Sequence, residues 1–228
     1  MQNRVLAIAS HPDDEIIGCG GTLIKHKNSG DKVKVLFTSE SELARNKNLF
    51  IAKKKSFIRQ KIACTISKIL KFEKPIFLNF NNLSLTRADI TMMNKNIREV
   101  IESYKPTIIY THTPKDIHHD HRKTFESVII ATKPQNNLNI KKILTFEIPS
   151  STDYNFSSSC STFCPNYFVN IKDEIKLKIN LLKKYKNEMK KYPNSRSLRG
   201  IKNLAAYRGN MVSLDWAESF ELIRNIEF

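Results

Sequence analysis

Two short clusters of histidine and carboxylate residues dominate the polar chemistry of this 228-residue chain. The first, His11-Pro-Asp-Asp-Glu15, directly follows a short apolar run, and the second is His118-His-Asp-His121. Together with His112, the two clusters hold five of the six histidines. Catalytic zinc sites use three such ligands and keep one position open for water. The clusters therefore predict a metal site, provided that the fold brings them together.

The metal ligands are expected from both clusters. His11 and Asp14 are close enough in sequence to bind one ion from a single loop. His121 would complete the set from a neighbouring strand end. The ligand types favour zinc, with iron(II) or another divalent ion as the alternative, because histidine and carboxylate suit several such ions.

The remaining polar residues of the clusters are candidates for proton transfer. Asp13, which is not needed as a ligand, would act as the general base toward a water molecule activated by the ion. His118, as an imidazolium, would stabilise the oxyanion and protonate the leaving amine, and Asp120 would hold the His118 tautomer. In the alternative interpretation, the acidic pair caps a helix and the histidines lie on the surface. The presence of two clusters at neighbouring strand ends argues against it.

Strands and helices alternate along the first two-thirds of the chain. Apolar and β-branched runs predict strands over 4–9, 33–38, 76–80, 107–111 and 142–147. Helical periodicity and turn signals predict helices over 22–27, 50–71, 88–104 and 123–132. This alternation predicts an α/β fold with a mostly parallel sheet and helices on both faces. Ligands of such sheets bind beyond the carboxyl ends of the strands, where the segments beginning at His11, Ser39, His112 and Glu147 should meet.

The pattern changes after Pro149. A polar loop is expected over 150–164, an edge strand over 167–171, and helices over 172–191, 196–208 and 215–226. No linker or internal repeat divides the sequence. We therefore expect one domain over 1–228, in which about 1–150 form the core sheet with the metal site. Residues from about 151 to 228 would add a substrate-side loop and a helical C-terminal extension.

Composition limits the partners. The formal net charge is +16, but the basic residues are spread along the chain rather than gathered in one stripe, so nucleic-acid binding is not expected. The excess charge is explained either by solvated helix faces or by attraction of an anionic substrate. No window is apolar enough for a membrane span, and the N-terminus lacks the apolar core of a secretory signal, which predicts a cytoplasmic protein. Cys160 and Cys164 have no further ligands nearby and are interpreted as reduced thiols.

The two clusters resemble the signature motifs of the LmbE/PIG-L family of zinc-dependent N-deacetylases. The resemblance rests on Ala9-Ser-His-Pro-Asp-Asp-Glu15 followed by Gly18-x-Gly-Gly21, and on His118-x-Asp-His121. It covers roughly 1–150 and implies a Rossmann-like sheet and hydrolysis of N-acetyl groups, commonly from substrates that contain N-acetylglucosamine. By this resemblance, the metal ligands are His11, Asp14 and His121. Asp13 matches the general base, and His118 matches the residue that stabilises the oxyanion or acts as the acid.

The C-terminal third resembles one branch of that family, through segments such as Glu147-Ile-Pro-Ser-Ser-Thr152 and Pro193-Asn-Ser-Arg-Ser197. The branch is associated with bacterial surface-polysaccharide and nonulosonic-acid pathways. This resemblance implies an acetamido-sugar substrate that carries a nucleotide or a lipid, and membership of the family suggests a homo-oligomer.

Four further residues are candidates for substrate binding. Arg59 lies where family members carry a substrate-contacting arginine, although the companion glutamate is replaced by Ile62. The family aspartate after the third strand is also replaced, by Asn79-Phe-Asn-Asn82. Arg196 and Arg208 could bind a phosphate or carboxylate, but an internal pair of Arg208 with Glu218 is an open alternative. Glu147 would either hold sugar hydroxyls or cap a local loop.

Taken together, these features predict a metal-dependent hydrolase that removes an N-acetyl group from a small amino sugar. If the excess positive charge serves to attract the substrate, this amino sugar is anionic. The alternative is a non-catalytic module that binds a nucleotide or sugar nucleotide. Gly18-x-Gly-Gly21 suggests such a module, but the spacing differs from G-x-G-x-x-G, and the acidic cluster would repel a pyrophosphate.

Overall fold

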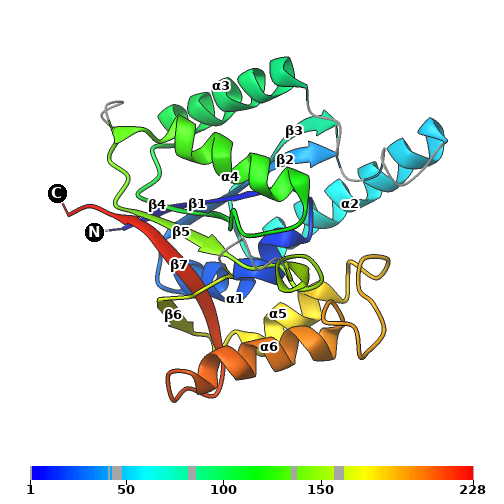
Figure 1. Cartoon of the computed structure of the whole chain (residues 1–228), viewed down its shortest axis with the longest axis vertical. Coiled ribbons are helices and arrows are strands. Elements are labelled where there is room, and N and C mark those ends of the chain that lie inside the picture. The colour runs from blue at the N-terminus through cyan, green and yellow to red at the C-terminus, as the bar shows by residue number, and fades with distance from the viewer. Residues whose placement is uncertain are drawn as a thin grey trace.

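A single mixed sheet organises the chain (Figure 1). The computed structural model describes residues 2–40, 42, 48–81, 86–134, 138–156 and 162–227. Within these residues the strands are β1 (Arg4–Ala9), β2 (Lys32–Glu40), β3 (Ile76–Asn81), β4 (Ile108–His112), β5 (Lys142–Phe146), β6 (Tyr167–Asn170) and β7 (Ala217–Asn225). Their order in the sheet is β3-β2-β1-β4-β5-β7-β6.

The helices are α1 (Asp14–Asn28), α2 (Leu49–Ile69), α3 (Arg87–Tyr104), α4 (His119–Ala131), α5 (Ile175–Leu182) and α6 (Leu198–Asn210), with a short 3₁₀ turn η2 at Thr152–Tyr154. The strands from β3 to β5 run parallel, and β7 pairs antiparallel with both β5 and β6. The predicted α/β class, with a mostly parallel sheet and helices on both faces, is confirmed.

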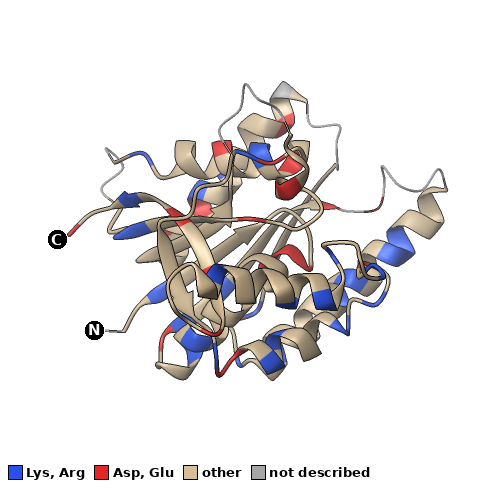
Figure 2. Cartoon of the chain, turned by 60° about the horizontal axis from the view of Figure 1, so that its bottom comes forward, with Lys and Arg blue, Asp and Glu red and all other residues tan. Residues whose placement is uncertain are grey.

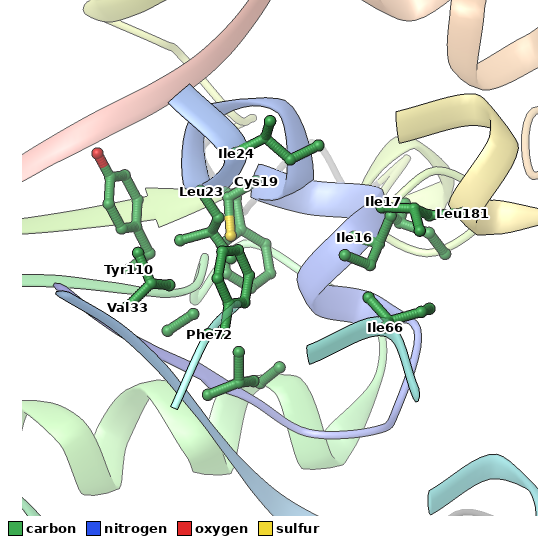
Figure 3. Packing of buried hydrophobic residues seen from close by; sticks show 14 of the residues in the cluster. Ile16, Ile17, Cys19, Leu23, Ile24, Val33, Ile66, Phe72, Tyr110 and Leu181 are labelled. Atoms are coloured by element: carbon green, nitrogen blue, oxygen red, sulfur yellow. The ribbon is translucent and has the colours of Figure 1, made fainter. Parts of the chain in front are cut away.

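The core lies on both faces of the sheet, as the strand period of two requires. In β1, Val5 and Ala7 pack with α1 and α2, whereas Leu6 and Ile8 pack with α3 and α4 on the other face. Figure 3 shows the first of these clusters. Buried apolar side chains of α1, α2 and α5 meet there, among them Ile16, Leu23, Ile66 and Leu181.

The C-terminal third differs from the prediction in two elements. The predicted helix over 215–226 is wrong, because this segment forms β7 between β5 and β6. Phe220 and Leu222 are two residues apart and both face the first core cluster, as the period of a strand requires. The predicted helix over 172–191 is too long, since α5 ends at Leu182 and turns follow.

Two other predicted elements are present, one of them with a different start. The edge strand near 167–171 is confirmed as β6. The helix predicted over 123–132 begins earlier, at His119, so the second histidine cluster occupies the first turn of α4. Among the helices of the described chain, none combines the length and the apolar character that a bilayer crossing requires.

A buried ion pair joins the C-terminal third to α1. The backbone of α1 departs from helical geometry at Cys19, which leaves peptide groups near the kink without helical partners. The Glu218 carboxylate of β7 accepts hydrogen bonds from the N–H groups of Gly21 and Thr22 at 2.8 and 2.7 Å. Lys178 of α5 donates to the carbonyl oxygen of Ile17 at 2.8 Å and pairs with Glu218 at 2.6 Å.

We predict that Glu218→Ala destabilises the protein strongly. The substitution leaves the Lys178 ammonium buried without its partner, and breaking a buried pair in this way costs about 3–5 kcal/mol. Urea unfolding followed by circular dichroism measures the change. The matched control is Lys172→Ala, which removes a solvent-exposed pair with Asp215 and should leave the midpoint unchanged. An equal midpoint for the two variants would contradict the role of Glu218.

Candidate active site

The site forms where β1 and β4 end side by side in the sheet. These strands pair in parallel, so the loop after β1 and the loop after β4 meet at one edge. The first loop carries His11 and Asp13 and leads into α1, which begins at Asp14. The second leads into α4, whose N-cap residue is His118. Asp13 is the N-cap residue of α1 and has a φ of 127°, a conformation that costs an L residue about 1–3 kcal/mol and is typical of functional sites.

The three predicted metal ligands converge. Nδ1 of His11 lies 3.2 Å and Nε2 of His121 lies 3.4 Å from the same oxygen, Oδ2 of Asp14. One possible ligand atom from each of the three residues lies within 4.8 Å of the other two, and all three residues are buried. The Oδ1 atom of Asp14 is also buried, and it makes no hydrogen bond within the described chain. Two imidazoles and a carboxylate in this arrangement fit a divalent ion such as zinc.

The protonation of His121 supports the same conclusion. Burial lowers the pKa of His121, but the carboxylates of Asp116 and Asp14 on either side outweigh burial and raise this pKa to about 10. The imidazole is therefore positively charged when only protein groups surround it. Two ionised carboxylates that stabilise an imidazolium so strongly would also attract a metal cation.

His118 and Asp120 lie beside this group, but their contacts differ from those expected. Oδ2 of Asp120 lies 3.0 Å from Nε2 of His11, so its carboxylate orients His11 rather than His118. His118 instead accepts a hydrogen bond through Nδ1 from the backbone N–H of Asp120, at 3.2 Å. His11, His118 and Asp120 form a second set of groups close enough to hold an ion, which overlaps the first at His11.

The charge of His118 also differs from the prediction. Burial, together with the neighbouring His121 and His11, lowers the pKa of His118 to about 3. The side chain is therefore neutral at neutral pH, not an imidazolium. Because Nδ1 accepts from Asp120, the remaining proton of the neutral ring is on Nε2. His118 is thus a hydrogen-bond donor through Nε2.

Asp13 is held between two arginines. Nη2 of Arg59 lies 3.1 Å from Oδ1, and Nη2 of Arg196 lies 2.8 Å from Oδ2. Burial raises the pKa of Asp13, and the two guanidinium groups oppose this rise without cancelling it. Each carboxylate oxygen has two acceptor positions, so both arginine contacts leave capacity for a further proton donor.

A cavity of about 250 Å³ brings these side chains to a common space. Six of the residues predicted from the sequence line it: His11, Asp14, Arg59, His118, His121 and Arg196. Ser150, Ser151, Glu188 and Lys190 complete the lining and were not expected. The two predicted arginines thus reach the cavity while they also hold Asp13.

Glu147 and Arg208 lie elsewhere. Their side chains form a bidentate ion pair, with Nε and Nη2 of Arg208 each 2.7 Å from a Glu147 oxygen. Neither residue lines the cavity. The internal pair foreseen for Arg208 exists, but the partner predicted for it was wrong, because Glu218 pairs with Lys178 instead. This geometry favours a structural role for both residues over a role in substrate binding.

Two residues that orient His121 were not predicted. Oδ2 of Asp116 lies 3.0 Å from Nδ1 of His121, and it also accepts a hydrogen bond from Thr152 at 2.8 Å. His112 stacks on His121 with ring centroids 4.0 Å apart and accepts a hydrogen bond from the Ser10 N–H. The position of Asp116 between His112 and the second cluster is the only signal for it in the sequence.

The surroundings of the site include other expected positions. The side chain of Asn79 accepts a hydrogen bond from Gln60 at 2.8 Å, and Asn79 does not line the cavity. Asn82 falls outside the described residues. Cys164 is exposed and free, whereas Cys160 falls outside the described residues. Cys164, like Asn79, does not line the cavity.

Comparisons with known proteins agree with this geometry. The family model described as GlcNAc-PI de-N-acetylase (PIG-L) matches residues 6–132, which is more than half of the chain. Diacetylchitobiose deacetylase from Thermococcus kodakarensis is 26% identical over 98% of this chain and 84% of its own length.

Solved structures share the fold. N,N'-diacetylchitobiose deacetylase from Pyrococcus horikoshii superposes with a TM-score of 0.76 at 21% identity, covering 97% of this chain and 84% of its own. The 4-carboxy-2-hydroxymuconate hydratase GalB from Pseudomonas putida also matches, with a TM-score of 0.73 at 18% identity over 100% of this chain and 98% of its own. A fold that serves both a deacetylase and a hydratase does not by itself define the reaction.

We predict that Asp116→Ala weakens metal binding by about 10–100-fold, because a ligating histidine loses the carboxylate that orients its ring. Competition between the purified protein and a chromophoric chelator for zinc measures the affinity. Asp116→Asn, which keeps an acceptor oxygen, should recover part of the loss. Asp173→Ala, on an exposed turn before α5, is the control. An unchanged zinc affinity in Asp116→Ala would exclude this positioning role.

Proposed function

Because this chain belongs to the GlcNAc-PI de-N-acetylase (PIG-L) family, we propose that it is a metal-dependent hydrolase that removes the N-acetyl group of an acetamido sugar. One observation carries the proposal. A set of ligands that fits a divalent ion and an additional carboxylate, Asp13, are fixed side by side next to one cavity. A binding module would need the pocket but has no use for a buried carboxylate held ready by two arginines.

The ion would be held by His11, Asp14 and His121. When bound, it supplies Lewis-acid chemistry that polarises the amide carbonyl group and makes water more acidic. We propose zinc, and iron(II) remains the alternative because the same ligand types suit both ions.

Asp13 would serve as the general base. In the reaction a water O–H bond breaks and its proton passes to Asp13, while the oxygen forms a bond to the carbonyl carbon. The proton then moves to the amide nitrogen as the C–N bond breaks, which gives acetic acid and a free amine; proton transfer between these products then gives acetate and the ammonium form of the amine. The two arginines fix the carboxylate so that it needs no reorientation during proton transfer.

His118 would stabilise the negative charge that develops on the carbonyl oxygen. The hydrogen bond from the backbone of Asp120 leaves the His118 proton on Nε2, and the side chain lines the cavity. A neutral imidazole with this tautomer is a suitable oxyanion donor. The proton for the leaving amine would then come through Asp13 rather than from an imidazolium.

The substrate would be small. The cavity of about 250 Å³ lies just below the usual range of ligand pockets, about 300–1,000 Å³. The similarity to diacetylchitobiose deacetylase supports an acetamido sugar. Lys190 and Arg196 at the cavity would favour a substrate with an anionic group, such as a nucleotide or lipid phosphate from surface-polysaccharide synthesis. A cytoplasmic location and a homo-oligomeric state remain predictions of the sequence.

Asp13→Asn should strongly reduce turnover and leave the ion bound. We expect kcat for acetate release to fall by about 10²–10⁴-fold, the contribution of a positioned general base. The assay uses the zinc-loaded protein with a panel of acetamido sugars that are free, linked to UDP or CMP, or lipid-linked. Asp215→Asn, at an exposed carboxylate, is the control.

The panel separates the outcomes. Acetate release by the wild type and by Asp215→Asn, but not by Asp13→Asn, supports the proposal and identifies the substrate. Equal release by Asp13→Asn would exclude its role as base. No release by a wild-type protein that binds one ion per chain would exclude N-acetyl hydrolysis of these sugars and redirect the search to other acyl groups.

For His118→Gln we expect a decrease in kcat of about 10²–10³-fold with KM nearly unchanged, because a bond to the oxyanion forms only in the transition state. Steady-state kinetics on the best substrate of the panel measure both constants. A change confined to KM would instead place His118 among the groups that bind the ground state.

A further inference from the structure

The N-terminal half of α2 presents a large apolar surface to solvent. Phe50 is 78% exposed and Phe57 is 56% exposed, and Leu49, Ile51 and Ile58 are exposed beside them. In Figure 1 this half of α2 extends away from the rest of the chain. Single apolar residues on a surface are ordinary, but a contiguous group of this kind marks an interaction site.

The spacing places the exposed aromatics on one side of the helix. Phe50, Lys54, Phe57 and Lys61 follow one another at intervals of four, three and four residues, which is one helical face. The opposite face packs on the protein, through the buried residues Ala52, Ser56, Arg59, Ala63, Ile66 and Ser67. The aromatic side chains therefore point away from the core, and nothing in the described chain covers them.

The same surface is strongly basic. The sequence from Asn48 to Lys71 contains no aspartate or glutamate. It contains lysines at 53, 54, 55, 61, 68 and 71. Figure 2 shows blue bands along this helix. The ammonium group of Lys61 lies 4.4 Å from the ring centroid of Phe57, so charge and apolar surface are interleaved rather than separated.

The combination identifies the partner. A second copy of the chain would bring the same lysines face to face, which is unfavourable. A nucleic acid would neutralise the lysines but would gain little from covering Leu49, Ile51 and Ile58. An anionic bilayer satisfies both features, because apolar side chains enter the boundary with the acyl chains while lysines meet the headgroups.

A groove beside this surface adjoins the active-site cavity. Its volume is about 400 Å³, and Lys55 and Ile58 of α2 line it together with Lys184 from the segment after α5. Arg59 and Glu188 line both the groove and the active-site cavity, and their side chains form an ion pair at 3.5 Å. Residues at the border of the exposed face of α2 thus line a groove with several lysines that adjoins the active-site cavity.

We propose that the outward face of α2 docks the protein on an anionic lipid surface, with Phe50 and Phe57 inserted at the interface and the lysines bound to headgroups. Docking in this way turns the groove toward the membrane, where a substrate with an anionic, lipid-borne group would enter. The docking itself is independent of the reaction assigned to the cavity, so it is tested without turnover.

Sedimentation with vesicles tests the proposal. The full-length protein is mixed with vesicles of phosphatidylcholine alone or of phosphatidylcholine and phosphatidylglycerol in equal amounts, at low and at high salt. We expect binding only to the anionic vesicles and weaker binding at high salt. The double variants Phe50→Ser with Phe57→Ser, and Lys54→Glu with Lys61→Glu, should each reduce the partition coefficient by more than about tenfold.

A matched control lies on α3, which covers the opposite face of the sheet. Met92→Ser with Lys95→Glu makes the same two kinds of substitution in one double variant, at an exposed apolar side chain and an exposed lysine, and it should bind vesicles like the wild type. All substituted side chains are exposed, and circular dichroism verifies that the variants fold. Absence of vesicle binding, or equal losses in the control, would overturn the proposal. So would a dimer, or binding to RNA in place of vesicles, that depends on Phe50 and Phe57.

Discussion

Three consecutive carboxylates, Asp13, Asp14 and Glu15, are buried directly after β1, and much of the structure follows from the need to compensate them. A buried charge without a partner costs several kcal/mol, so each carboxylate requires a group from elsewhere in the chain. Asp13 receives Arg59 and Arg196, and Asp14 receives His11 and His121. Glu15 avoids the charge instead, because burial raises its pKa to about 8 and the side chain is largely protonated at neutral pH. It accepts a hydrogen bond from the Tyr185 hydroxyl at 3.1 Å. The loop after β1 therefore depends on α2, on α4 and on the segment between α5 and α6.

The sequence was sufficient to predict the parts of the site that are local. His11 and Asp14 lie three residues apart after β1, and His121 lies in the first turn of the helix beyond the neighbouring strand, so parallel pairing alone brings them together. The partners of the arginines could not be predicted in this way. Arg196 reaches Asp13 across more than 180 positions of sequence, and the Arg208–Glu147 pair depends on where α6 lies. That placement depends in turn on β7, whose segment had been predicted as a helix.

The error over β7 has a physical cause. A strand that enters a sheet antiparallel between two others is selected by its neighbours, and its own pattern need not be strictly alternating. Two buried glutamates, Glu218 and Glu221, interrupt the apolar positions of β7, and both are compensated by lysines, Lys178 and Lys115. Charges inside a strand suggest a solvent-exposed helix when only the sequence is considered. Here they are buried because partners from α5 and from the loop after β4 lie close to them.

The cavity is lined by residues from both inside and outside the region that matches the family, and this bears on substrate specificity. The family match ends at residue 132 and includes all three expected metal ligands, Asp13 and His118. Arg59, which also lines the cavity, lies within the match as well, whereas the remaining lining residues lie beyond it: Ser150, Ser151, Glu188, Lys190 and Arg196. The residues expected to react therefore lie within the family match, whereas most of the cavity wall lies outside it. These two groups of residues are under different constraints. The reacting groups must keep their geometry to within a fraction of an ångström, whereas the wall need only complement the substrate. Substrate specificity is therefore expected to reside in the segments after residue 132, anchored to the reaction centre by the contact between Arg196 and Asp13.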